Sequence, residues 1–125
     1  MRMLALGVGA AAIFGLATFH AANAATNDVR FRVVNNSNRT IVDVRASNID
    51  MDQYGPDLLG DYVVRTNQYM VVEPRNPGNY CRFDIRIEFN NGDVQEIRDV
   101  NLCRTRDLAT WGWNHNRFYH EVRYI

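Results

Sequence analysis

The sequence predicts an all-β protein: a single-domain β-sandwich of about seven antiparallel strands with one disulfide, with a small β-barrel as the alternative. Three observations predict this fold. Apolar and charged residues alternate strictly over residues 81–89, which is the period of a strand with one buried face. The other β-branched runs are short and are separated by Asn, Gly, Pro and Asp, which favour turns. No stretch of useful length combines helical periodicity with capping residues.

The first residues have the composition of an export signal. Arg2 supplies a positive charge, residues 4–19 are uncharged and almost all apolar, and Ala-Asn-Ala at 22–24 is the small-residue pattern that signal peptidase cleaves. An uncleaved membrane anchor is the alternative, but the apolar run is shorter than the about 20 residues that span a bilayer. We therefore expect residues 1–24 to be a signal peptide. Residues 25–125 would then form a periplasmic or secreted domain with no stable membrane insertion after cleavage.

The β-branched runs predict seven strands. They cover residues 29–34, 40–46, 62–65, 69–73, 81–89, 94–102 and 117–125. In the second of these strands we expect Val42, Val44 and Ala46 to face inward, since alternate residues of a strand share a face. The Asn-rich residues 35–38 precede it and predict a turn, because Asn side chains hydrogen-bond their own backbone. A long loop, residues 47–60, follows it.

The clearest predicted element is a β-hairpin around residues 90–93, where Asn and Gly tolerate the positive φ of a tight turn. The strand before the turn has five apolar side chains on one face: Cys81, Phe83, Ile85, Ile87 and Phe89. The strand after it is irregular, because the apolar Val94 and Ile97 have opposite parity. We therefore predict a β-bulge between Gln95 and Asp99, which lets the two cysteines approach each other.

Cys81 and Cys103 are the two cysteines of the chain. In an exported protein an even pair is most simply one disulfide. Two free thiols, or half of a metal site, are the alternatives. A bond between them would restrict the unfolded chain and contribute about 3 kcal/mol of stability.

Residue types that serve in catalysis are few in the predicted domain. It has no Lys, its serines are Ser37 and Ser47, and its histidines are His115 and His120. Neither serine lies in a G-x-S-x-G motif, and on an extended strand the two histidines would face opposite ways. An enzyme is therefore disfavoured, and we assign no catalytic residue.

The long loop is acidic and partly matches a calcium-binding loop. Asp50, Asp52, Asp57 and Asp61 are the candidate ligands of a Ca²⁺ ion, the one cofactor that the sequence suggests. Tyr54 stands where the pattern has an oxygen ligand, and an aspartate replaces its final glutamate. The alternative is a solvated loop whose aspartates cap turns.

A Trp-rich polar segment is the second candidate site. Trp rings can stack on a sugar or a peptide while neighbouring amides form hydrogen bonds. Trp111, Trp113, Asn114 and His115 are therefore candidate ligand-binding residues, together with Tyr54 of the acidic loop. The alternative is that both tryptophans fill the core.

Several short motifs occur together in an order that is typical of one family. They are Thr40-Ile41-Val42, Ala46-Ser47-Asn48, Tyr54-Gly55-x-Asp57-Leu58-Leu59-Gly60, Cys81-x-Phe83-Asp84-Ile85, Asn91-Gly92 and Asn101-Leu102-Cys103. With these motifs, residues 29–103 resemble a family of small, uncharacterised exported proteobacterial proteins, with Tyr54 where a Trp is expected. The resemblance implies a disulfide-bonded β domain of the cell envelope, and it brings no catalytic residues.

These features together favour a non-enzymatic binding or interaction module of the bacterial envelope. Its partner would be an envelope protein or a glycan. The 14 basic and 14 acidic residues balance, which argues against nucleic acid, because a nucleic-acid surface shows a clustered basic excess. The alternatives are a calcium-stabilised structural domain and an inhibitor of an envelope hydrolase.

Overall fold

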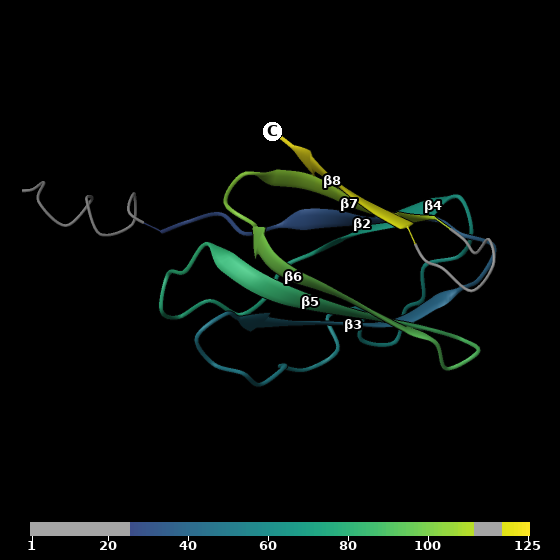
Figure 1. Ribbon diagram of the computed structural model, residues 1–125, viewed down its shortest axis with the longest axis horizontal. Helices are drawn as coiled ribbons and strands as arrows, with labels where there is room; N and C mark the ends of the chain where they lie inside the picture. The colour runs from purple at the N-terminus through teal and green to yellow at the C-terminus, as the bar shows by residue number, and fades with distance from the viewer. Residues whose placement is uncertain (1–25, 112–118) are drawn as a thin grey trace, which may run out of the picture.

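The computed structural model describes residues 26–111 and 119–125, and the regular structure within them is all β-strand. Seven strands form two sheets that lie one above the other (Figure 1). The four-stranded sheet has the order β4 (Gln68–Val72), β2 (Phe31–Asn36), β7 (Thr105–Trp111), β8 (Tyr119–Tyr124). The three-stranded sheet has the order β3 (Ile41–Asn48), β5 (Arg82–Phe89), β6 (Val94–Asn101). The predicted β-sandwich is confirmed.

The predicted signal peptide, residues 1–24, lies outside the described residues. A search of the described part of the chain finds no helix of the length and apolarity that crossing a membrane requires.

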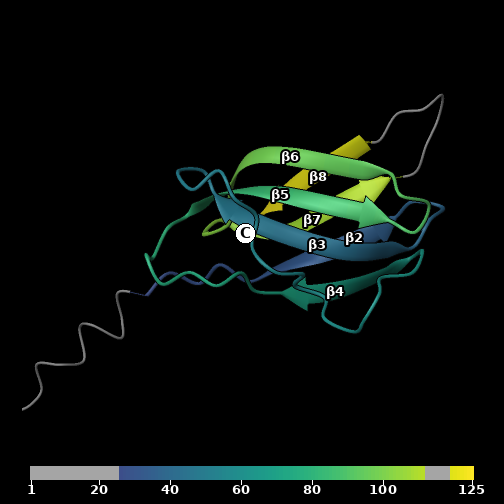
Figure 2. The same ribbon diagram turned by 90° about the horizontal axis from the view of Figure 1, so that it is seen from below.

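Strands β2 and β7 are neighbours in the four-stranded sheet and run parallel, whereas the other neighbouring strands run antiparallel. A parallel pair needs a long crossover connection. Here the chain leaves β2, builds the three-stranded sheet and β4, and only then returns as β7. Figure 2 shows the three-stranded sheet in front of the strands that this crossover joins. The sequence predicted antiparallel strands throughout, and the parallel pair of β2 and β7 differs from that prediction.

The core lies between the two sheets and consists of the inward faces of both. Its completely or nearly completely buried side chains include Phe31, Val33, Ile85, Ile87, Phe89 and Leu108. Burying one such side chain contributes about 1.5–3 kcal/mol relative to leaving it in water. The strict alternation of β5 is confirmed, since its apolar residues are buried and its charged residues are not.

The inward face of β3 differs from the prediction. Ile41 and Val44 are buried, whereas Val42 is only partly buried. The pairing of β3 with β5 shifts register between Ile41 and Asp43. This irregularity changes which face of the sheet a residue takes, so the prediction that Val42 faces inward is wrong.

The hairpin of β5 and β6 forms as predicted. Gly92 has a φ of +91°, and its N–H donates to the carbonyl of Phe89 at 2.9 Å. The predicted bulge is confirmed as a register shift opposite Phe83 and Ile85, and it lies between Ile97 and Val100. Because of this phase, Val94 is exposed and Gln95 is buried.

Strand β7 was not predicted, while the predicted strand at residues 62–65 is absent apart from one bridge between Ile41 and Val64. Three buried polar residues explain why β7 escaped detection: Thr105, Asp107 and Thr110. They interrupt the alternation of apolar and polar residues that marks a strand. The last predicted strand, 117–125, is described as β8 from Tyr119 onward, at an edge of its sheet.

The predicted Asn-rich turn forms around a buried amide. The Nδ2 of Asn35 donates to the carbonyls of Arg39 at 2.6 Å and Val64 at 2.8 Å. Its Oδ1 accepts the backbone N–H of Ser37 at 2.9 Å. This side chain therefore ties the turn after β2 to the loop before β4, and its hydrogen-bonding groups are satisfied.

The predicted disulfide joins Cys81 and Cys103, whose Cα atoms are 5.1 Å apart. It links the residue before β5 to the second residue after the end of β6. A structural disulfide indicates an oxidising compartment outside the cytoplasm.

Candidate functional site

The acidic loop folds back along the free edge of β3. The N–H of Gly55 donates to the carbonyl of Ala46 at 3.0 Å, and the N–H of Leu58 donates to the carbonyl of Val44 at 2.7 Å. The Oδ1 of Asp57 accepts the N–H groups of Val44 and Leu59, both at 3.0 Å. The carboxylate of Asp57 therefore caps backbone groups of the edge strand and of the loop.

The other predicted calcium ligands lie on the outside of this loop. Asp50, Asp52 and Asp61 are exposed, and Asp52 has a φ of +49°. Within the described residues no three His, Cys, Asp or Glu side chains are placed to hold a metal ion together. The structure therefore does not bring the four predicted aspartates into one cluster, and the calcium site stays a prediction.

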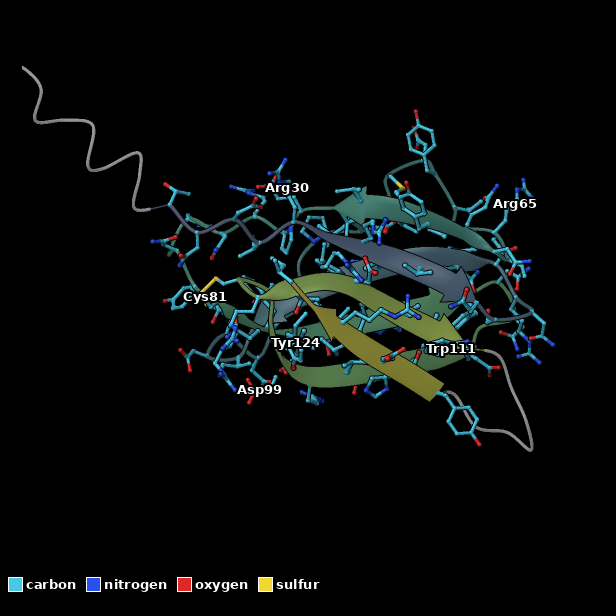
Figure 3. All side chains as sticks on the ribbon, turned by 90° about the horizontal axis from the view of Figure 1, so that it is seen from above. Arg30, Arg65, Cys81, Asp99, Trp111 and Tyr124 are labelled. Carbon is cyan, nitrogen blue, oxygen red and sulfur yellow. A yellow bond between two sulfur atoms is a disulfide. The ribbon has the colours of Figure 1, made fainter. Side chains whose placement is uncertain are left out.

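The predicted ligand-binding residues are not brought together either. The hydroxyl of Tyr54 donates to Glu96 of β6 at 3.4 Å, and partial burial raises the pKa of this tyrosine. Trp111 is half-buried at the end of β7, in the other sheet, with the guanidinium of Arg123 5.5 Å from its ring centroid. Figure 3 places Trp111 at the opposite end of the sandwich from Cys81. Three further predicted residues lie outside the described residues: Trp113, Asn114 and His115.

A pocket of about 360 Å³ lies beside the acidic loop, between residues 46–55 and 75–80. We call it the loop pocket. Its lining includes Met51, Pro77, Tyr80 and Phe83. Its size falls at the lower end of the range of small-ligand sites, which are mostly apolar and concave.

The wall of the loop pocket at 75–80 is a turn held by one amide side chain. The Oδ1 of Asn76 accepts the N–H of Tyr80 at 2.8 Å, and its Nδ2 donates to the carbonyl of Tyr80 at 2.7 Å. At Gly78 an added Cβ would lie 2.2 Å from the Tyr80 ring, so a side chain at this position would displace the ring. Tyr80 directly precedes Cys81, so the disulfide anchors this wall to the sheet.

The opposite wall is held in a similar way. The Oδ1 of Asn48 accepts the N–H of Asp50 at 3.0 Å. The hydroxyl of Ser47 accepts the N–H of Gln53 at 3.2 Å and donates to the carbonyl of Asn48 at 3.1 Å. Because these polar groups position the two loops, the pocket presents mainly apolar surface to a ligand.

Asp107 forms a charged centre on the outer face of the four-stranded sheet. Its side chain is 1 % exposed, and Arg32 of β2 donates to its two oxygens at 2.5 Å and 2.9 Å. Arg106 and Arg123 lie 3.3 Å and 3.8 Å from the same carboxylate. The hydrogen bonds from Arg32 are the main reason that the pKa of Asp107 is lowered. The guanidinium of Arg32 also lies 4.9 Å from the ring centroid of Tyr69.

Sequence reasoning did not identify the loop pocket. Met51 and Tyr80 are exposed and were assigned to no predicted strand, and Phe83 was interpreted as part of a hairpin. The one available signal was the Asn76-Pro77-Gly78 turn immediately before the first cysteine. The pocket itself depends on two loops that lie far apart in sequence.

Fold and pocket together define a disulfide-bonded β-sandwich with a small apolar pocket at one end. A scan against protein-family models found no match to this chain. Searches of curated proteins and of solved structures found no match either. The resemblance to a family of exported proteobacterial proteins therefore stays a prediction.

Proposed function

We propose that this protein is a non-enzymatic binding module of the bacterial envelope, and that the loop pocket takes one apolar side chain of a protein partner. The observation that carries the proposal is the chemistry of the pocket lining. Ser47, Asn48 and Asn76 use polar atoms to hold the loops. Gln53 and Arg75 also line the pocket, but its exposed lining is mainly apolar and includes Met51 and Tyr80. A sugar stacked on the ring of Tyr80 would need free hydrogen-bonding groups around that ring. An apolar side chain would not.

Location supports this proposal. The disulfide indicates a compartment outside the cytoplasm, and the first 24 residues have the composition of an export signal. We infer that the module works in the periplasm or after secretion, where its partner is an envelope protein.

A displayed peptide library can test the proposal. Peptides selected on the wild-type domain should share one large apolar residue. Their affinity should fall about tenfold or more in Met51→Glu, because a charge at the pocket wall opposes burial of an apolar group. Val71→Glu is the matched control, because Val71 is 54 % exposed and Met51 is 60 % exposed, and Val71 does not line the loop pocket.

Two results would contradict the proposal. One is a set of selected peptides that bind both variants equally. The other is binding at Met51 and Tyr80 of peptidoglycan fragments but not of peptides, which would make the partner a glycan. The calcium and hydrolase-inhibitor hypotheses stay predictions.

A further inference from the structure

A second pocket, of about 280 Å³, lies on the side of the sandwich where the bulge of β6 approaches the last strand. It is lined by Arg82, Asp99, Asn101, Arg104 and Tyr124. We call it the arginine pocket. Figure 3 shows Asp99, Tyr124 and Cys81 toward the same end of the molecule. All five lining residues are polar, in contrast with the apolar lining of the loop pocket.

The disulfide fixes the two arginines of this pocket relative to each other. Arg82 directly follows Cys81 and Arg104 directly follows Cys103. The N–H of Leu102 also donates to the carbonyl of Cys81 at 2.7 Å. The backbones that carry both guanidinium groups are therefore held by a covalent bond and a hydrogen bond, which limits the entropy lost when a ligand binds.

The carboxylate and amide oxygens of the arginine pocket already accept hydrogen bonds. Asp99 accepts from Nε and Nη2 of Arg82 at 2.7 Å and 3.0 Å, one bond to each carboxylate oxygen. These bonds are the main reason that the pKa of Asp99 is lowered. The Oδ1 of Asn101 accepts the N–H of Cys103 at 3.2 Å. A ligand that donates hydrogen bonds would therefore find few partners here.

The donor atoms of the pocket, in contrast, are in part unused. The guanidinium of Arg104 is exposed and has no hydrogen-bond acceptor or ion-pair partner among the described residues. Neither the Nη1 of Arg82 nor the Nδ2 of Asn101 donates to any described acceptor. Two arginines and one aspartate give the lining a formal charge of +1. Its unused capacity is thus cationic and donating, which matches the oxygens of a carboxylate or a phosphate.

We propose that the arginine pocket binds the oxyanion group, carboxylate or phosphate, of a small ligand. Arg104 provides the main charged contact, Arg82 and Asn101 provide further N–H donors, and Tyr124 closes the side of the pocket. Asp99 does not contact the ligand but holds Arg82 in place. This site is separate from the loop pocket and does not depend on the function proposed for it.

Amide chemical shifts of the ¹⁵N-labelled, disulfide-intact protein can test this proposal. Inorganic phosphate and acetate are titrated separately, with sodium chloride adjusted to keep the ionic strength constant, because exposed charges respond to salt alone. We expect saturable shifts at Asp99, Asn101, Arg104 and Tyr124. Arg104→Gln should weaken the binding of the effective anion about tenfold, which is the usual effect of losing one charge-assisted hydrogen bond.

Arg65→Gln is the matched control, since Arg65 is also exposed and Figure 3 places it at the opposite end of the sandwich. The Arg65→Gln variant should bind the effective anion with the same affinity as the wild type. Tighter binding of phosphate identifies a phosphate ligand, and tighter binding of acetate identifies a carboxylate. The proposal is overturned if neither anion gives saturable shifts, or if Arg65→Gln and Arg104→Gln weaken binding equally. Because the Arg104 guanidinium has no hydrogen-bond or ion-pair partner among the described residues, an unchanged spectrum of Arg104→Gln away from the pocket verifies that the variant is folded.

Discussion

The outer faces of the two sheets carry ion pairs of different kinds. On the three-stranded sheet most pairs are local and join residues two positions apart on one strand. These are Asp43 with Arg45, Arg86 with Glu88, and Glu96 with Arg98. On the four-stranded sheet one local pair joins Glu121 and Arg123 of β8. The other pairs converge on Asp107, which Arg32 reaches from β2 and Arg123 from β8.

This difference separates ion pairs that a single strand can form from ion pairs that need the whole fold. A pair two positions apart on one face forms in any extended chain, and exposed pairs of this kind contribute less than about 1 kcal/mol. Asp107 meets Arg32 only because β2 and β7 are neighbours and run parallel. The carboxylate of Asp107 is buried, whereas the side chain of Arg32 remains partly exposed to water. The contribution of this ion pair to stability therefore depends on tertiary structure.

Replacing Asp107 should give the largest loss of stability among the variants of the two outer faces. In Asp107→Ala we expect unfolding to become easier by about 3 kcal/mol, because three arginines lose their shared acceptor. The control Glu88→Ala removes a partner of Arg86 on the other face and should cost less than about 1 kcal/mol. Denaturant titrations of both variants measure the two values. Equal losses would mean that the faces do not differ.

The same carboxylate predicts a share of the acid sensitivity. Arg32 lowers the pKa of Asp107 below its ordinary value of 3.8. A lowered pKa in the folded state gives stability that is complete above the unfolded pKa and is lost as the pH falls through the folded one. The wild type should therefore lose stability as the pH falls below about 4, and Asp107→Asn should lose less over that interval. Unfolding free energies measured at a series of pH values would contradict this prediction if both slopes were the same.

The comparison also shows what the sequence could reveal. Local periodicity predicted β5, the turn at 90–93 and the bulge of β6, because each depends on residues close together in the chain. It failed at β7, since the inward Thr110 and the buried Asp107 are polar. Without β7 there was no way to foresee the parallel pair or the Asp107 centre.

The pockets were hidden for a similar reason. Met51 and Tyr80 lie on two loops that line one pocket in the folded chain. No residue spacing in the sequence predicts that these loops lie close together. The cysteines offered a partial signal, because Arg82 and Arg104 each follow one of them. Correct pairing of the cysteines could have placed these arginines near each other, but their unused donors depend on side-chain contacts.

The loop along the free edge of β3 also contains a carboxylate whose contribution depends on the fold, but with a smaller expected effect. Asp57→Ala removes the acceptor of two backbone N–H groups, so we expect a loss of about 1 kcal/mol, as for a lost cap. Asp61→Ala is the matched control, because Asp61 is exposed and directly follows the same loop. Thermal melting should place Asp57→Ala between Asp107→Ala and the wild type, with Asp61→Ala unchanged. A loss at Asp61 as large as that at Asp57 would show that charge, not capping, stabilises the loop.

Calcium should have the smallest effect on stability. The candidate ligand Asp57 already binds two N–H groups through one oxygen, and its three partner aspartates are not clustered with it. A ligand that binds only the native state at 100 times its Kd adds about 2.7 kcal/mol, so occupied calcium would be visible in a melting curve. We expect equal melting temperatures in calcium and in chelator. A rise with calcium that magnesium does not reproduce, and that Asp52→Asn abolishes, would instead establish the acidic loop as a metal site. The stability of the loop would then depend on several charged groups that converge on one ion, as the arginines of the four-stranded sheet converge on Asp107.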